Sequence, residues 1–342
     1  MKPAMLDLPQ FWLQKGWSAR ALWPFAACFS GTVQARAVAY RRGWLRSHRI
    51  GVPVVVVGNL FVGGTGKTPL VIWLVERLQA YGCRPGVVAR GYNATTGGKL
   101  RVVDATDDPV RMGDEAVLIA ARTSAPVAVG ADRVAAAELL VRERRCDLII
   151  SDDGLQHYRL ARDAEIAVFD AERGVGNGHC LPAGPLREPL SRLRRVDLVL
   201  GNGGAVSAGG YAFHLIPGPL AALGGGCSAV EPPVVGARVR AVAGIGHPER
   251  FFRLLRMQGY RVVSHPFPDH HPFRQKDLQF AERLPIIMTE KDAVKCRQMA
   301  MDGLWCLPVT AEPDIPTLEA LDSLFMRFLQ RTGCNRPWPN LA

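Results

Sequence analysis

A glycine-rich segment has the residue types and spacing of a phosphate-binding loop. Residues 54–68 read Val-Val-Val-Val-Gly-Asn-Leu-Phe-Val-Gly-Gly-Thr-Gly-Lys-Thr. Glycines let backbone amides approach phosphate oxygens, and a helix that begins after the loop adds the positive end of its dipole. Lys67 would neutralise the β- and γ-phosphates, and the Thr68 hydroxyl would ligate Mg²⁺. The strict pattern has glycine where this chain has Phe61. We predict an ATP site formed by Phe61, Val62, Gly63, Gly64, Thr65, Gly66, Lys67 and Thr68.

Two adjacent carboxylates follow a later apolar run. Asp152 and Asp153 come directly after a strand predicted at residues 147–151. They therefore lie at its carboxyl end, which faces the ligand crevice in open α/β sheets. Adjacent carboxylates repel each other unless a cation is near, which favours a Walker B role in holding Mg²⁺ directly or through water. The alternative is a turn followed by a helix cap, because Asp and Gly both favour turns.

Two further polar clusters have the residue types of a catalytic pair. Asp114 and Glu115 begin a predicted helix, where acidic residues often only complement the helix dipole. A kinase also needs a base that orients and deprotonates the attacking hydroxyl, and a carboxylate here can serve. Asp269-His270-His271 lies between prolines in a rigid polar loop that could reach across a cleft. The alternative for these histidines is a purely structural role.

The elements that would position these residues alternate between strands and helices. The apolar run at residues 52–57 is typical of a buried parallel strand, and residues 67–81 have helical periodicity with Pro69 in the first turn. This alternation favours a P-loop-type, doubly wound and mainly parallel α/β sheet. Further strands are predicted at 85–89, 127–130, 147–151, 165–170 and 196–200, with helices at 115–122 and 132–144.

A second, smaller α/β alternation follows. Gly, Ala, Ser and Pro dominate residues 201–233, which indicates a domain boundary or a flexible connection. Beyond it we expect strands at 238–243, 261–265, 285–289 and 304–309, and helices at 248–258, 290–297 and 317–331. The predicted organisation is an N-terminal segment at 1–49, a P-loop core at 50–220, and a smaller α/β domain with the C-terminal helix at 234–342.

The composition limits the classes of function. The chain has 342 residues, which suits two domains, and its 48% hydrophobic content excludes wholesale disorder. Its net charge of +11 favours an acidic partner: a phosphorylated small molecule, an anionic membrane or nucleic acid. No basic stretch interleaved with aromatics has the spacing of a nucleic-acid module, so we expect no nucleic-acid partner. The eight cysteines include no CxxC pair and indicate a reducing compartment.

The N-terminal residues combine aromatic and basic side chains. Trp12, Trp17 and Trp23 stand near Lys15 and Arg20, and further arginines follow up to residue 49. No run of about 18 uncharged apolar residues is present, and the pattern is not that of a signal peptide. Tryptophans beside basic residues favour a helix that lies in the lipid interface. The alternative is a core helix of a soluble domain.

These motifs, in this order, resemble those of the tetraacyldisaccharide 4′-kinase family, which phosphorylates a lipid A precursor. The resemblance covers nearly the whole chain and includes residues 58–60, 63–69, 90–92, 113–115, 130–133, 152–157, 181–188, 267–270 and 289–292. It implies a P-loop core, a smaller α/β domain and an N-terminal helix in the cytoplasmic leaflet of the inner membrane, peripheral or monotopic. The implied reaction is ATP-dependent phosphorylation of the 4′-hydroxyl of a tetraacylated glucosamine disaccharide 1-phosphate, giving lipid IVA.

The resemblance also implies the roles of single residues. Asp114 would be the catalytic base, and His270, supported by Asp269, would pair with it when the second domain closes onto the first. The resemblance marks residues 289–292 as characteristic, but no role for them follows from their chemistry. The remaining implied site residues are Lys67, Asp152 and Asp153 in catalysis, Thr68 and Glu115 at Mg²⁺, and Tyr92, Arg133, Gln156, His157 and Arg187 at the substrate.

Two other functions remain open at this point. A P-loop kinase for a soluble sugar or nucleoside would explain the loop but would not need the Trp- and Arg-rich N-terminus. A membrane-associated P-loop switch or ATPase would need a residue that positions water and no sugar site.

Overall fold

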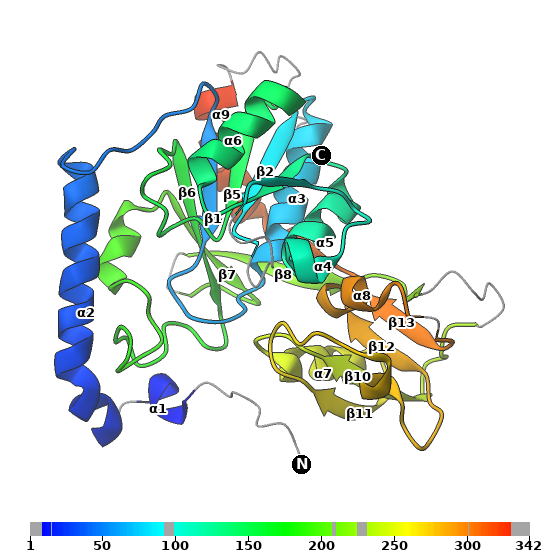
Figure 1. Ribbon diagram of the computed structural model, residues 1–342. Helices are drawn as coiled ribbons and strands as arrows, with labels where there is room; N and C mark the ends of the chain where they lie inside the picture. The colour runs from blue at the N-terminus through cyan, green and yellow to red at the C-terminus, as the bar shows by residue number, and fades with distance from the viewer. Residues whose placement is uncertain are drawn as a thin grey trace.

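The apolar strand before the glycine-rich loop, β1 (Val54–Gly58), is the central strand of a nine-stranded sheet in this computed structural model (Figure 1). The structure describes residues 9–14, 16–91, 99–206, 210–223, 231–299 and 301–329. All five residues of β1 are buried, as expected for a strand covered on both faces. The strand order is β14 (Val309–Pro313), β8 (Tyr211–Pro217), β7 (Leu198–Asn202), β6 (Ala164–Asp170), β1, β5 (Leu148–Asp152), β2 (Pro85–Ala89), β4 (Val127–Val129) and β3 (Arg101–Val103).

The seven strands from β8 to β4 are parallel, and only β14 and β3 at the two edges run antiparallel to their neighbours. This confirms the predicted doubly wound, mainly parallel sheet. Apolar side chains of α3 (Lys67–Ala80), α5 (Asp114–Thr123) and α9 (Ile315–Leu329) fill the core on one face. Those of α6 (Arg133–Arg144) cover the other, together with the 3-10 turn Leu190–Arg195. The carboxyl ends of β1, β5, β6 and β7 therefore meet along one edge.

A second sheet of five strands forms the smaller domain. Its order is β11 (Arg261–Pro266), β10 (Arg238–Ala243), β12 (Ile286–Thr289), β13 (Leu304–Leu307) and β9 (Ala221–Ala222), with β9 antiparallel to β13. Helix α7 (Pro248–Met257) packs Phe251, Phe252 and Leu255 on one face. Helix α8 (Glu290–Cys296) packs on the other and lies next to α5 at the junction of the two sheets (Figure 1).

Two segments lie elsewhere than expected. We predicted one strand at 304–309 and a C-terminal helix in the smaller domain. The chain instead leaves β13 at Leu307, and β14 pairs with β8 at the edge of the large sheet. Helix α9 then buries Leu321, Phe325 and Phe328 in the large core. Strand β8 lies within the region 201–233 that we interpreted as a boundary; its own residues are mostly apolar, and it pairs with β7 on one side and β14 on the other.

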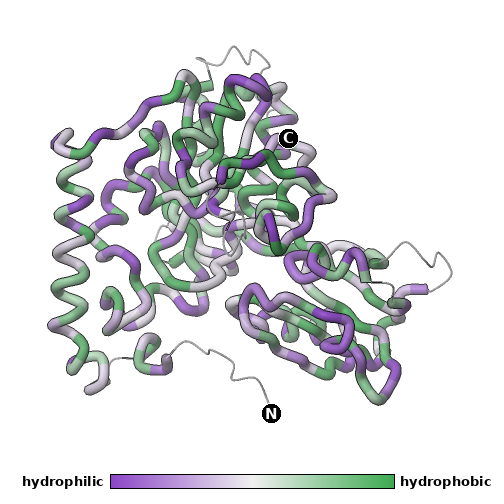
Figure 2. The backbone as a smooth tube through the Cα atoms, viewed as in Figure 1, coloured by the Kyte–Doolittle hydropathy of each residue, from purple (hydrophilic) through white to green (hydrophobic). Residues whose placement is uncertain are grey.

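The N-terminal region stands beside the large domain as α1 (Gln10–Leu13) and the 25-residue α2 (Trp17–Arg41), drawn in blue in Figure 1. Trp12 Nε1 donates to Pro182 O at 2.9 Å, and Tyr40 stacks on Tyr158, so both ends of this region contact the body. Figure 2 shows hydrophobic and hydrophilic residues alternating along α2. Among the helices in the described part of the chain, none is long and apolar enough to cross a membrane.

Candidate active site at the junction of the two sheets

The glycine-rich loop connects β1 to α3 as predicted. Gly66 has a φ of 84°, which favours glycine, and a Cβ there would lie 2.2 Å from Asn202 Nδ2. Two buried asparagines hold the loop. Asn59 Nδ2 donates to Gly63 O at 3.1 Å, and Asn202 Nδ2 donates to Thr65 O at 3.2 Å. The loop's backbone is thus preorganised, and its free amides lie at the amino end of α3.

The side chain of Phe61 does not face this site. It is 2% exposed and packs in the core with Leu60 and Leu186, on the side of the sheet covered by α6. The backbone of Val62 is also engaged, since its amide donates to Pro185 O at 2.9 Å. Neither residue lines the cavity beside the loop, whereas Gly64 through Thr68 do. The aromatic residue at position 61 therefore anchors the loop to the core.

Two acidic residues at the carboxyl end of β5 have different environments. Asp153 has a φ of 49° and pairs with Lys67 Nζ at 3.3 Å and Arg187 NH1 at 2.9 Å. These cations outweigh burial and hold the pKa of Asp153 well below its usual range. Asp152 is fully buried; burial, then the nearby Glu115 charge, raises its pKa. No donor among the described residues reaches Asp152 Oδ1.

A divalent cation fits the chemistry of this place. A buried carboxylate oxygen without a partner, near a second carboxylate, is unfavourable until a cation approaches both. Asp152 and Glu115 provide such a pair, and oxygen ligands are those that Mg²⁺ prefers. Thr68 and Glu115 both line the cavity beside the loop. The residues present therefore suit Mg²⁺ bound between the loop, β5 and α5.

Positive charge surrounds the same acidic pair. Arg133, at the start of α6, is 3% exposed, and no acceptor among the described residues reaches its Nε or NH2. Asp152 and Asp153 are its electrostatic partners. Burial, then the charges of Arg133 and Arg90, lowers the pKa of His157 to about 4, so this imidazole is neutral near neutral pH. A buried guanidinium with free donors is a ready receptor for phosphate oxygens.

Asp114 and His270, which we predicted to form a catalytic pair, meet across the junction. His270 Nδ1 lies 3.0 Å from Asp114 Oδ1 and 3.0 Å from Asp114 Oδ2. Asp114 is buried, which alone raises its pKa. The His270 hydrogen bond and the charges of Lys291 and Lys295 outweigh burial and hold that pKa well below the usual range. His270 has a φ of 59°, a left-handed conformation that is uncommon for a non-glycine residue and is often found at functional sites.

Other predicted residues have different surroundings. Gln156 Nε2 donates to Asn59 O and to Glu188 Oε1, so it stabilises the start of the glycine-rich loop. Asp269 Oδ1 accepts from the His270 amide at 3.0 Å and from Lys291 Nζ at 3.3 Å, so it supports His270. Tyr92 lies outside the described residues.

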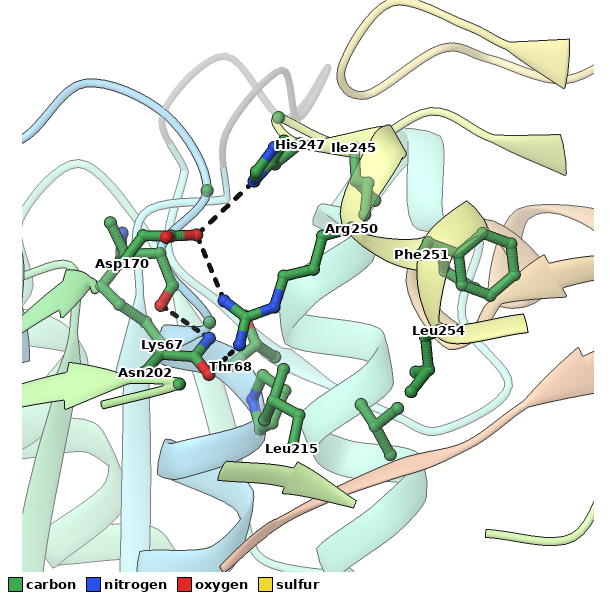
Figure 3. A pocket seen from close by; sticks show the side chains of 18 of the residues that line it. Lys67, Thr68, Asp170, Asn202, Leu215, Ile245, His247, Arg250, Phe251 and Leu254 are labelled. Carbon is green, nitrogen blue, oxygen red and sulfur yellow. Dashed lines mark hydrogen bonds and ion pairs between the residues drawn. The ribbon is translucent and has the colours of Figure 1, made fainter. Parts of the chain in front are cut away.

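A cavity of about 880 Å³ opens beside the loop, between the two domains (Figure 3). Arg250 of α7 reaches across it to Asp170 Oδ2 at 3.2 Å and to Asn202 Oδ1 at 2.6 Å. His247 Nδ1 lies 3.6 Å from the same Asp170 oxygen. Apolar side chains complete the wall, among them Leu215, Ile245, Phe251 and Leu254. The size and mixed lining suit a nucleoside.

Sequence reasoning missed Asp170 and Asn202. Each is the last residue of a buried strand, the same signal that identified Asp152, so the pattern was available. The ligand atoms of Asp170, Glu172 and His247 lie within 4.8 Å of one another. Arg250 and Arg253 already pair with the two carboxylates, which disfavours a metal ion there.

Comparisons with known proteins relate the whole chain to one family. Residues 18–326 match the family model described as tetraacyldisaccharide-1-P 4′-kinase. The chain is 53% identical to a tetraacyldisaccharide 4′-kinase of Alkalilimnicola ehrlichii, over 96% of this chain and all of that protein. It is 51% identical to one of Halorhodospira halophila, over 96% and 99%. The crystal structure of LpxK from Aquifex aeolicus in complex with ATP superposes with a TM-score of 0.75 and 26% identity, covering 91% of this chain and 99% of that one.

Proposed function

The chain belongs to the tetraacyldisaccharide 4′-kinase family, and from that premise we propose how its junction transfers phosphate from ATP to the 4′-hydroxyl of an acylated disaccharide 1-phosphate. One observation supports the proposal above the others: Asp114 at the start of α5 and His270 of the smaller domain meet at 3.0 Å, beside the phosphate-binding loop. A base held by a partner next to bound phosphates is what hydroxyl phosphorylation needs.

The nucleotide binds between the domains in this proposal. Its phosphates lie on the amides of the loop, and Lys67 neutralises their charge. Asp153, which is itself paired with Arg187, holds Lys67 in place. The nucleoside occupies the cavity lined by Asp170, Asn202 and Arg250. Thr68 and Glu115, with Asp152 nearby, would hold Mg²⁺, which would supply charge neutralisation on the phosphate oxygens.

The acceptor approaches from the side of Asp114. Its 4′-oxygen forms a bond to the γ-phosphorus as the bond from that phosphorus to the β,γ-bridging oxygen breaks, and ADP leaves with the electron pair. Asp114, kept ionised by its low pKa, takes the hydroxyl proton. Arg133, which has unpartnered buried donors, stabilises the charge that develops on the transferred group. His157, Gln156 and Asp269 complete the acceptor side.

We also infer that α2 holds the enzyme at the cytoplasmic face of the inner membrane. Trp17, Trp23 and Phe25 are exposed on this helix. No acidic residue occurs between Asp7 and Glu76, while arginines 20, 36, 41, 42, 46 and 49 lie on or just after the helix. Exposed aromatics with a basic flank suit the interface of an anionic leaflet. The acyl chains of the substrate then stay in the bilayer while the sugar reaches the junction.

Transfer of labelled γ-phosphate from ATP to an acylated disaccharide 1-phosphate, presented in mixed micelles, tests the proposed function. We expect a labelled lipid product and ATP turnover that depends on added lipid. ATP turnover without lipid would favour a P-loop ATPase, and labelling of free glucosamine would favour a kinase for soluble sugars. Asp114→Asn, which keeps the shape of the side chain but not its charge, is the matched negative control.

A further inference from the structure

In the segment Thr289–Asp292, to which we assigned no role from its chemistry, every side chain has a partner. Thr289 caps α8, and Asp292, which is 0% exposed, accepts from Thr289 Oγ1 and from the Gly244 amide. Glu290 pairs with Arg122 of α5 and accepts from the Val309 amide. These contacts fasten the start of α8 to Gly244, directly after β10, on one side and to the large domain on the other.

Lys291 is the residue of this segment that points into the catalytic pair. Its Nζ lies 3.1 Å from Glu115 Oε1 of the large domain. It also lies 3.3 Å from Asp269 Oδ1 and 3.3 Å from His270 Nε2. The side chain is mostly buried among these three groups. Lys291 therefore contacts the two acidic residues beside the pair, Glu115 and Asp269, and the imidazole nitrogen that faces away from Asp114.

The ammonium group of Lys291 can only donate hydrogen bonds, which limits the tautomers that are compatible with the position of His270. If Lys291 is the donor in this 3.3 Å contact, His270 Nε2 is the acceptor and carries no proton. The remaining proton is then on Nδ1, where it is donated to Asp114. An imidazolium would direct an Nε2–H toward the Lys291 charge. Asp269 Oδ1 lies 3.9 Å from Nε2 and is itself bound by Lys291.

We propose that Lys291 is a positioning residue that holds His270 as the neutral Nδ1–H tautomer with this N–H directed at Asp114. The inference rests on the proposed function only for its catalytic consequence. In that tautomer the single Nδ1–H of His270 orients the Asp114 carboxylate, which stays ionised and can accept the hydroxyl proton. His270 itself has no free nitrogen to take the proton, so it does not relay it.

Lys295, one helical turn later, supports the same arrangement from the other side. Its Nζ pairs with Asp292 at 2.7 Å and lies 3.7 Å from Asp114 Oδ2. The two lysines thus have distinct targets: Lys291 faces the imidazole, and Lys295 faces the carboxylate. Removing Lys291 should change the state of His270 while leaving one cation beside Asp114.

The test is the tautomer of His270, read by long-range proton–nitrogen NMR on the full-length protein labelled with ¹⁵N-histidine, in micelles without nucleotide or Mg²⁺. The signal is assigned by its loss in His270→Asn. We expect the neutral Nδ1–H pattern in the wild type and its replacement by an Nε2–H or mixed pattern in Lys291→Met. Lys291→Arg, which keeps a donor, should retain the wild-type pattern in part. Lys276→Met, an exposed lysine of the same domain, is the matched control.

If His270 of the wild type shows the Nε2–H pattern, or if Lys291→Met leaves the NMR pattern unchanged, the inference is wrong and the proposed function still stands. Kinetic measurements test the proposed function separately. We expect Lys291→Met to lower kcat by about 10- to 100-fold with little change in KM for ATP, as for a misplaced catalytic group. A changed tautomer with an unchanged kcat would instead contradict the proposed role of the Asp114–His270 pair. Thermal unfolding of both Lys291 variants checks that the fold is intact.

Discussion

His270 Nδ1 lies within 3.0 Å of both oxygens of Asp114, although the two residues are 156 positions apart in the chain. Asp114 belongs to the first turn of α5 on the large sheet, and His270 follows β11 of the small one. The orientation of the Asp114 carboxylate, the base in our proposal, therefore depends on how the two domains are joined. We expected closure of the second domain to form this contact; in this structure it is already formed.

The contact predicts that Asp114 and His270 act as one unit. Asp114→Ala and His270→Ala should each lower kcat strongly with little change in KM for ATP, and the double variant should be hardly slower than the worse single one, because residues that act together give non-additive losses. Steady-state kinetics of the three variants measure this. His271→Ala is the matched control, since His271 pairs with Asp277 instead. Losses that multiply fully would mean that the two residues act independently.

Lys67 should be needed for transition-state stabilisation. Its Nζ is held by Asp153 beside the loop, so Lys67→Ala removes a fixed charge from the phosphates. We expect kcat/KM to fall by a factor that corresponds to the loss of about 3–5 kcal/mol of transition-state stabilisation. This is the size of one or two strong charge-stabilising contacts. The comparison is with Lys99→Ala, an exposed lysine away from the loop. Near-wild-type kcat/KM in Lys67→Ala would remove Lys67 from the mechanism.

Asp152 should reduce stability in the absence of Mg²⁺. Burial and the Glu115 charge raise the pKa of Asp152. At pH values between the ordinary Asp pKa and this raised one, the folded chain keeps a proton that the unfolded chain has lost. Stability then falls as pH rises from the ordinary Asp pKa to the raised one. Asp152→Asn removes this dependence. Its Tm should exceed that of the wild type by more at about pH 8 than at about pH 5, with about 2–4 °C for each kcal/mol regained.

Calorimetry without nucleotide or metal measures that difference, and the same variant should lose kinase activity. Asp152→Asn unfolding at a lower temperature than the wild type at both pH values would show that the carboxylate is stabilised by its surroundings. Asp147→Asn, at the opposite end of the same strand and paired with Arg84, is the control and should show no such gain.

The aromatic face of α2 should determine membrane binding. Trp17 is 82% exposed, and Trp23 and Phe25 are also exposed. Changing all three to Ser should weaken binding to anionic liposomes by about 10-fold or more, because each buried aromatic contributes on the order of 1–3 kcal/mol. The arginines should leave a residual, salt-sensitive component. Ile315→Ser, with a comparably exposed side chain on α9, should bind as the wild type does; equal binding of all three proteins in flotation assays would contradict the role of α2.

Local sequence was enough to predict the elements and the polar ends of several of them. The loop from Gly63 to Thr68 depends on glycine conformations and on a strand–helix order that neighbouring residues encode. Asp152 was found because a polar residue at the end of an apolar strand faces the crevice of any parallel sheet. The Asp114–His270 pairing came from resemblance, since nothing in either local pattern indicates the other.

Tertiary structure alone decided which distant segments meet. Hydrophobic periodicity shows that α9 buries one face, but many sheets could accept that face, and the chain returns β14 and α9 to the large domain. Phe61 is a loop residue by spacing and a core residue by packing. Lys291 is an ordinary helical lysine in the sequence. Its place between Glu115, Asp269 and His270 exists only because α8 of one sheet packs against α5 of the other, and such long-range contacts leave no local pattern.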